Sequence, residues 1–385
     1  MQSLFRSNVF ILSFLFVELL FNPASAFFYE MESPTEYVDF NDVWGTAADD
    51  VFAVGTGGTI VHYDGEQWSL MESRTTRCLN AVWGVSASDV YAVGNNGTIL
   101  HYNGNIWESM IGKNDQDLSD IWGLSPEEVY AVGENLSLFR YDGADWSFMN
   151  GPSEAPIDEL HSIWGTSSDN IYVSGGKVGP STVFHYNGTE WETVYSNSDS
   201  YSPTWSSLWG TGSFMFAVFY SEVSLIAYYD GLDWQKILMT RHTAFNAVHG
   251  TAYDDVYIAG SDRPWATPPP EPPYSWSMLY HFDGNYTKRF DMQAEENFNG
   301  VWCISSTEIF LVGDDNNIVF YDGNPETNST TTSIPTTTST TTTTIPDNPC
   351  IIESILGESS NKTDMVLNPN ESDRVIPFKM TGKSH

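Results

Sequence analysis

Four histidines are the first candidates for chemistry in this sequence: His62, His101, His185 and His281. A neutral imidazole is a common metal ligand and a common general base. The four residues, however, occupy the same position in four copies of an internal repeat. The symmetry of the repeat must therefore spread them around the molecule, so they cannot share a metal ion. We predict half-buried structural histidines.

Aromatic side chains in one long insert form the second candidate group. The insert runs from Asp262 to Ser277 and holds six prolines together with Trp265, Tyr274 and Trp276. Proline lowers the cost of ordering a loop, and exposed aromatic rings can stack on a sugar or anchor a protein. We predict that these rings bind a ligand; the alternative, weighed equally, is that the insert only covers a sheet edge. The residues predicted to bind with them are Arg263, Lys177, Tyr201 and Trp205.

These residues must be positioned by a repeated unit. A Trp-Gly pair, degenerate in the last two copies, recurs at spacings of 39 to 53 residues. A period of about 40 to 45 residues with short strands is typical of a β-propeller blade. The seven anchors are Trp44, Trp83, Trp122, Trp164, Trp209, His249 and Trp302.

The second copy shows the unit best. It predicts strand A over Asn80–Trp83, strand B over Asp89–Gly94, strand C over Gly97–Tyr102, and a strand D that begins at Trp107. An Asn-Gly or Asp-Gly pair between strands C and D predicts a type I′ turn. In copy six we place Tyr286 at the strand D aromatic position.

The seventh copy lacks a strand D, because it passes directly into a threonine-rich segment after residue 324. A short strand at Phe28–Met31 precedes copy one, and its Tyr29 has the same spacing to Trp44 as Trp68 has to Trp83. This strand can complete the last blade and leave no free sheet edge at the seam. We therefore predict an all-β fold: a single seven-bladed β-propeller over residues 27–324, closed by the N-terminal strand.

The aligned unit resembles a family of exported bacterial propellers with WGxSxxDVYAVGxxGTIxHYDGxxW repeats. It is also similar to Asp-box (BNR) propellers and to the photosystem II assembly-factor propeller, which place an Asp and Gly turn before a Trp at the same point. The Asp box reads Ser-x-Asp-x-Gly-x-Thr-Trp, whereas this chain has Tyr-Asp-Gly-x-x-Trp, so that match is partial. The resemblance implies the fold of the ring and leaves the activity open. The Gly-His and Trp-Asp signatures of WD40 repeats are absent at fixed offsets.

An enzyme on this scaffold would need non-repeated polar residues that converge on one face. A sialidase-like site would use three arginines, yet no motif ties Arg74, Arg77 and Arg263 together. A carboxylate pair cannot be singled out among 50 acidic residues, and Asp314–Asn317 lacks EF-hand spacing. We predict no catalytic residue, no cofactor and no metal.

Loop lengths favour one face of the ring. Strands alternate in direction within a blade, so the B–C and D–A loops share a face opposite the A–B and C–D loops. The aromatic that ends strand C lies 12 residues after the apolar residue that opens the body of strand B in copies one, two, three and seven, but 15, 14 and 26 residues after it in copies four, five and six. Inserts on one face of a repeat protein often mark the binding face. Ligand binding is therefore predicted at the B–C and D–A loops of blades four to six.

The ends of the chain lie outside the ring. Residues 1–26 are predicted to be a signal peptide, 325–349 a disordered Thr/Ser/Pro-rich linker, and 350–385 a short tail that begins at Cys350. We expect an exported protein, secreted or at the cell surface, without a transmembrane segment in the mature chain. A disulfide between Cys78 and Cys303 is a minority alternative.

The net charge of −35 argues against nucleic acid as a partner, because phosphate binding needs lysine and arginine. The sequence predicts a monomeric, non-enzymatic extracellular or cell-surface binding module for a protein or glycan ligand. The alternatives are an Asp-box-like carbohydrate hydrolase and an envelope assembly or scaffold factor.

Overall fold

A computed structural model of the chain describes residues 28–110, 115–152, 157–176, 180–201, 205–221, 223–240, 243–262, 276–291 and 297–323. Within these ranges, the side chains of residues 198–201, 205, 262, 276 and 291 are not described. The predicted signal peptide, linker and tail all lie outside the described residues.

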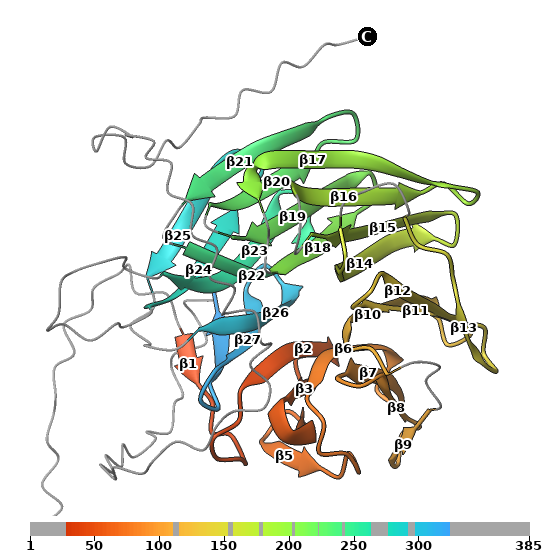
Figure 1. The fold of residues 1–385 in the computed structure, drawn as a ribbon. Helices are drawn as coiled ribbons and strands as arrows, with labels where there is room; N and C mark the ends of the chain where they lie inside the picture. Colours follow the sequence, from red (N-terminus) through yellow and green to blue (C-terminus); the bar gives the residue numbers. More distant parts are fainter. Residues whose placement is uncertain are drawn as a thin grey trace, which may run out of the picture.

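The described residues form seven four-stranded antiparallel sheets arranged as the blades of a propeller (Figure 1). Blades one to three comprise β2 (Phe40–Ala47), β3 (Asp50–Gly55), β4 (Ile60–Tyr63), β5 (Trp68–Met71); β6 (Leu79–Ser86), β7 (Asp89–Gly94), β8 (Thr98–Tyr102), β9 (Trp107–Ser109); and β10 (Leu118–Ser125), β11 (Glu128–Gly133), β12 (Ser137–Tyr141), β13 (Trp146–Phe148). Blades four and five comprise β14 (Leu160–Ser167), β15 (Asn170–Gly175), β16 (Pro180–Tyr186), β17 (Trp191–Tyr201); and β18 (Trp205–Thr211), β19 (Phe214–Tyr220), β20 (Ser224–Tyr229), β21 (Trp234–Thr240). Blades six and seven comprise β22 (Thr243–Ala252), β23 (Asp255–Asp262), β24 (Trp276–Phe282), β25 (Thr287–Asp291); and β26 (Phe298–Ser305), β27 (Glu308–Gly313), β28 (Ile318–Asp322), β1 (Phe28–Glu30). A 3₁₀ turn, η1 (Thr56–Gly58), lies between β3 and β4.

The ring is closed by the N-terminal strand, as predicted. Strand β1 pairs antiparallel with β28, and Tyr29 lies opposite Phe320. Figure 1 shows the red β1 beside the blue strands of the last blade. Further hydrogen bonds tie the first and last blades together, because the Asn316 side chain accepts the Val38 N–H and the Asn316 N–H donates to the Val38 carbonyl.

The core lies between the blades. Each second strand, such as DVYAVG in β7, is buried on both faces because a neighbouring blade covers each side. The first strands of successive blades pack side by side around the whole ring, ending with β26 beside β2.

The repeated Trp-Gly pair locks one blade to the next. A Cβ atom on Gly84 would lie 2.6 Å from the Trp44 ring, and one on Gly123 would lie 2.7 Å from the Trp83 ring. Glycine is therefore required by close approach of the preceding tryptophan. The same contact recurs at Gly45, Gly165, Gly210 and Gly250.

Blades six and seven depart from the pattern together. His249 stands where a tryptophan is expected, and Cys303 stands where the next glycine is expected. The Cys303 N–H donates to His249 Nδ1 at 3.2 Å, and the Cys303 thiol lies 3.6 Å from the His249 carbonyl oxygen. Burial lowers the pKa of His249 to about 4, so the ring is neutral and Nδ1 can accept. The smaller imidazole leaves the room that the Cys303 side chain fills.

Three details of the predicted repeat are corrected. Strand A of the second copy runs over Leu79–Ser86, because it continues through the Trp-Gly pair to the A–B turn. Tyr286 is 57 % exposed in a turn, and β25 begins only at Thr287. The C–D turn is a four-residue loop rather than a two-residue type I′ turn. In blade one, Asp64 accepts the Glu66 and Gln67 N–H groups, while Gly65 alone takes a positive φ.

Candidate functional site

The four repeated histidines are structural. Each Nε2 meets an oxygen of the residue that begins the second strand of its own blade, and each ring packs on an aromatic residue of that strand. The pairs are His62–Asp50 at 2.7 Å, His101–Asp89 at 2.7 Å, His185–Asn170 at 2.7 Å and His281–Asp255 at 2.9 Å. Each pair lies within one blade, which confirms the prediction that the histidines do not converge.

Blades four to six extend further than blades one to three on the B–C/D–A face. The fourth strand has 11 residues in β17 and seven in β21, but only three in β9 and β13. The added pairs lie at the B–C/D–A end, where Pro180 faces Tyr201 and Asp262 faces Trp276. We call these added rungs of blades four to six the raised wall.

The raised wall has a polar interior. Small hydroxyl and amide side chains are buried there, although such groups are mostly exposed in proteins. The buried residues of this kind are Ser181, Asn197, Ser224, Thr243, Ser261 and Ser277.

The predicted binding residues are only partly placed. The backbones of Tyr201, Trp205 and Trp276 lie at strand ends on the raised wall, in three consecutive blades. Their side chains are not described. Lys177, Arg263, Trp265 and Tyr274 lie outside the described residues.

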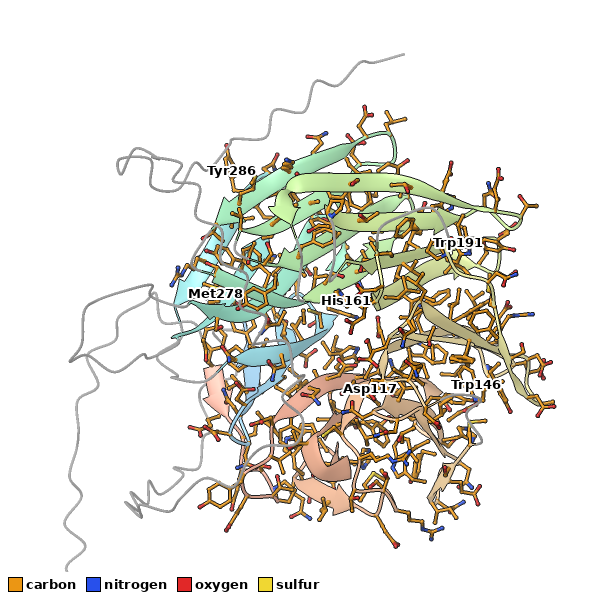
Figure 2. The ribbon with its side chains drawn as sticks, viewed as in Figure 1. Asp117, Trp146, His161, Trp191, Met278 and Tyr286 are labelled. Carbon is orange, nitrogen blue, oxygen red and sulfur yellow. The ribbon has the colours of Figure 1, made fainter. Side chains whose placement is uncertain are left out.

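A buried polar cluster joins blades four and five at the inner end of the raised wall. His161 Nδ1 lies 3.2 Å from the Ser206 hydroxyl, which lies 2.8 Å from the Ser174 hydroxyl. Glu159 Oε2 lies 3.9 Å from His161 Nε2. Figure 2 shows His161 near the centre of the ring and Tyr286 at its rim. A Glu-His-Ser order can relay a proton when the serine is accessible to a substrate. Ser206 is fully buried. The hydrogen bonds of His161 and Ser174 in blade four to Ser206 in blade five therefore hold the two blades together.

Two aspartates on the innermost strands also bridge neighbouring blades. Asp42 accepts the N–H of Val43 in its own strand and the N–H of Val82 in the next blade, both at 2.9 Å. Asp120 makes the same bridge to the blade that follows it. Burial raises the pKa of Asp42 to about 8, and repulsion from Asp120 adds to this, while the two donors act in the opposite direction.

Stability is expected to rise as the pH falls from 8 to 6.5. In the unfolded chain, Asp42 has the ordinary aspartate pKa of 3.8 and is ionised between pH 6.5 and 8. Across this window only the folded chain binds a proton at Asp42, so a falling pH favours folding. Stability is therefore lost as the pH rises through 8. One pH unit corresponds to at most about 1.4 kcal/mol. Asp42 is half-buried, and water at the carboxyl reduces the gain to about 1 kcal/mol.

Thermal melts between pH 6.5 and 8.5 measure this effect. His249, whose pKa is lowered, opposes the trend only below its ordinary value of 6.5.

The matched variant is Asp42→Ser, because a serine can make the same bridge without an ionisable group. In blade five, Ser207 holds the position of Asp42 and accepts the Val248 N–H of blade six. Most of the pH slope should be lost in this variant, and the remainder comes from Asp120, whose pKa burial raises to about 6, and from the buried Cys303 thiol, whose pKa is also raised. An unchanged slope would rule out Asp42 as its main source.

The cysteines do not form the Cys78–Cys303 pair. Cys78 is disulfide-bonded, whereas Cys303 carries a free and buried thiol whose pKa burial raises. Cys350 lies outside the described residues.

In the described ranges, no group of three or more His, Cys, Asp or Glu side chains is placed to hold a metal ion. No helix among the same residues has the length and apolar character needed to cross a membrane.

Comparisons with known proteins support the fold and show no family. No family model and no curated protein matches the chain. Among solved structures, YCF48 bound to D1 peptide is similar with 14 % identity and a TM-score of 0.57 over 77 % of this chain and 97 % of that one. The WD40 β-propeller domain of Doa1 has 13 % identity and a TM-score of 0.57 over 80 % and 100 % of the two chains.

An extracellular domain of a putative hybrid two-component system from B. thetaiotaomicron has 13 % identity and a TM-score of 0.59, over 77 % of this chain and 40 % of that one. At such identities the likeness establishes the propeller fold alone. The predicted membership of an exported bacterial or Asp-box family stays a prediction.

Proposed function

We propose that this chain is a non-enzymatic extracellular or cell-surface binding module. Its ligand, a protein or a glycan, binds the B–C and D–A loops of blades four to six. The observation that carries the proposal is the raised wall, which lies under the loops that the sequence makes longest.

The raised wall suits a binding surface for a physical reason. Its added rungs are hydrogen-bonded strand pairs, so they hold the loop ends in fixed positions and lower the ordering cost of binding. The wall spans three adjacent blades and brings Tyr201, Trp205 and Trp276 to one face by their backbone positions. Function in repeat proteins often resides on the face where the loops vary.

Two structural relatives are compatible with this role. One is YCF48, whose structure is that of a complex with a D1 peptide, and the other is an extracellular domain. We infer by analogy that this ring also recognises a partner outside the cytoplasm. The buried Glu159–His161–Ser206 cluster offers no accessible nucleophile, so it gives no support to the hydrolase alternative.

Replacing Trp265, Tyr274 and Trp276 together by alanine is expected to weaken ligand capture at least tenfold, because aromatic anchors carry most of the energy of such interfaces. The measurement is a pull-down from an envelope extract with mass spectrometry, run beside a glycan screen with the same bait. A single co-purified complex would indicate the scaffold alternative.

The matched control is Tyr286→Ala, which removes an exposed aromatic ring of the same blade on the opposite face. Capture should be unchanged in this variant. Equal capture by the triple variant and the wild type would overturn the proposed face.

A further inference from the structure

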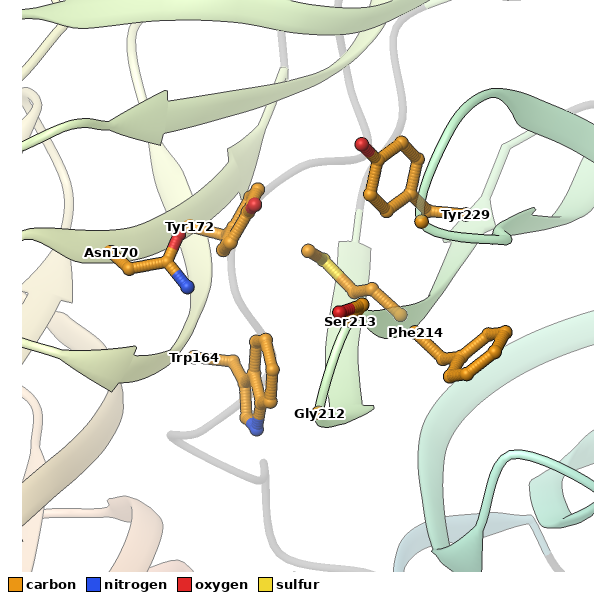
Figure 3. A pocket seen from close by; sticks show the side chains of 9 residues that line it. Trp164, Asn170, Tyr172, Gly212, Ser213, Phe214 and Tyr229 are labelled. Atoms are coloured by element: carbon orange, nitrogen blue, oxygen red, sulfur yellow. The ribbon is translucent and has the colours of Figure 1, made fainter.

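A pocket of about 190 Å³ opens between blades four and five on the A–B/C–D face, opposite the raised wall. Blade four contributes Trp164, Asn170 and Tyr172, and blade five contributes Ser213, Phe214, Met215 and Tyr229. Figure 3 shows Trp164 and Tyr172 on one side of the hollow and Tyr229 on the other. The pocket is too small for a drug-sized ligand and fits one compact group.

The pocket arises where the repeat loses one residue. The body of strand B begins six residues after the anchor tryptophan in copy five and seven residues after the anchor residue in the other copies. In six blades a register shift at the A–B turn absorbs the extra residue, as between Gly45 and Ala47. Strands β18 and β19 instead pair without a shift through Thr211 and Phe214.

This shorter hairpin changes the residues at the seam. Phe214 takes the place of the residue that pairs with the histidine in blades one, two, four and six, and Tyr228 takes the place of that histidine. The Phe214 ring turns towards blade six and stacks on Tyr253 at 4.8 Å. It therefore does not fill the space beside blade four.

An aromatic contact closes the interface, or seam, between neighbouring blades at several places in the ring. Between blades four and five the pocket lies in its place. At five seams the last aromatic of strand C meets the strand B aromatic of the preceding blade, with ring centroids 5.3 to 6.4 Å apart. Tyr172 and Tyr229 hold these positions in blades four and five, and the pocket lies between them. Trp234 packs on Tyr229 at 5.5 Å, and His185 packs on Tyr172 at 4.4 Å.

The surroundings of the pocket are negative. Burial raises the pKa of Tyr172, the facing Tyr229 adds to this, and Glu192, which is bonded to His185, contributes less. Asp230 adjoins Gly231 in the pocket wall. Its pKa is lowered by the Asp233 and Leu232 N–H groups, so it carries a full charge. The whole chain has a net charge of −35.

We propose that this pocket binds an organic cation, either a quaternary ammonium group or the side chain of a lysine or arginine on a partner. Aromatic rings attract a cation through their negative faces, and tryptophan and tyrosine do so best. Trp164, Tyr172 and Tyr229 supply such rings from two sides, and Glu192 and Asp230 add a negative field. This site is independent of the binding face proposed above.

The test uses the full chain and calorimetric titration with choline, arginine amide and lysine amide, at constant ionic strength. We expect binding with a Kd on the order of millimolar, as suits a single small group. Choline binding without the amides would indicate a free quaternary ammonium ligand, and the reverse would indicate a cationic side chain. Glucose and N-acetylglucosamine are the neutral probes, and tighter binding of either would overturn the proposal.

Tyr229→Ala removes one wall and should weaken cation binding at least fivefold. Tyr229→Phe keeps the ring and should bind within twofold of the wild type. Glu192→Gln, at a residue that is 57 % exposed, should weaken binding about twofold without affecting folding. No cation binding up to 50 mM, or equal binding by Tyr229→Ala in a chain with a wild-type melting temperature, would also overturn the proposal.

Discussion

His249→Trp is expected to destabilise the ring by about 3 kcal/mol, and Cys303→Gly in the same chain should restore most of that loss. At the seams that keep the Trp-Gly pair, a tryptophan contacts glycine so closely that a Cβ atom would lie under 3 Å from its ring. At the seam between blades six and seven, the Cys303 side chain occupies that space. A tryptophan at position 249 would therefore overlap the thiol.

Thermal and chemical unfolding of both single variants and the double variant form a thermodynamic cycle. We expect His249→Trp to lower the Tm by roughly 5 to 10 °C. Cys303→Gly alone should cost about 1 to 2 kcal/mol, through the lost contacts and the added freedom of glycine in the unfolded chain. The coupling energy between the two sites should be favourable by about 3 kcal/mol.

Gly123→Ala is the matched control for this cycle. It places a methyl group 2.7 Å from the Trp83 ring, at a seam that keeps the ordinary pair. It should be destabilising by about 2 to 3 kcal/mol and should not be rescued by Cys303→Gly. Additive effects of the two changes would show that His249 and Cys303 do not compensate each other at the seam between blades six and seven.

Tyr29→Pro should destabilise the ring by about 3 kcal/mol, which corresponds to a fall in Tm of roughly 5 to 10 °C. Tyr29 is the middle residue of β1, whose three residues pair with β28. Proline cannot donate to a strand ladder, so it would free the outer edge of β28. Phe28 would also leave Tyr321, whose ring centroid lies 5.0 Å away.

The control is Tyr29→Ala, which keeps the backbone donor and should cost much less. An exposed β28 edge should also promote self-association, which light scattering would detect in the proline variant alone. Equal stability of the proline and alanine variants would mean that β1 does not hold the ring closed.

The sequence predicted the fold well because each blade is specified locally. The Trp-Gly anchors, the apolar second strands and the Asp-Gly turns repeat at regular spacing, and they gave the blade number and the pairing of β1 with β28. The prediction placed the first residue of strand D in copy six one position too early, at Tyr286. In blades one to five the aromatic follows the turn aspartate or asparagine by four residues, and in blade six that position is Thr287.

The pocket between blades four and five was missed, although a signal was present. Copy five is one residue shorter between its anchor and strand B. Length alone does not tell whether the neighbouring side chains close over the gap. That outcome depends on Phe214, whose ring packs towards blade six rather than blade four.

The sequence by itself determined the seven-fold repeat, the strand order and the closure of the ring, because strands and turns are fixed by neighbours along the chain. Only the tertiary structure decided which side chains meet across a seam. The partners there come from different blades, as with His249 and Cys303 or Tyr172 and Tyr229, so no local pattern links them. The bridging role of Asp42 and the position of the pocket belong to this second class.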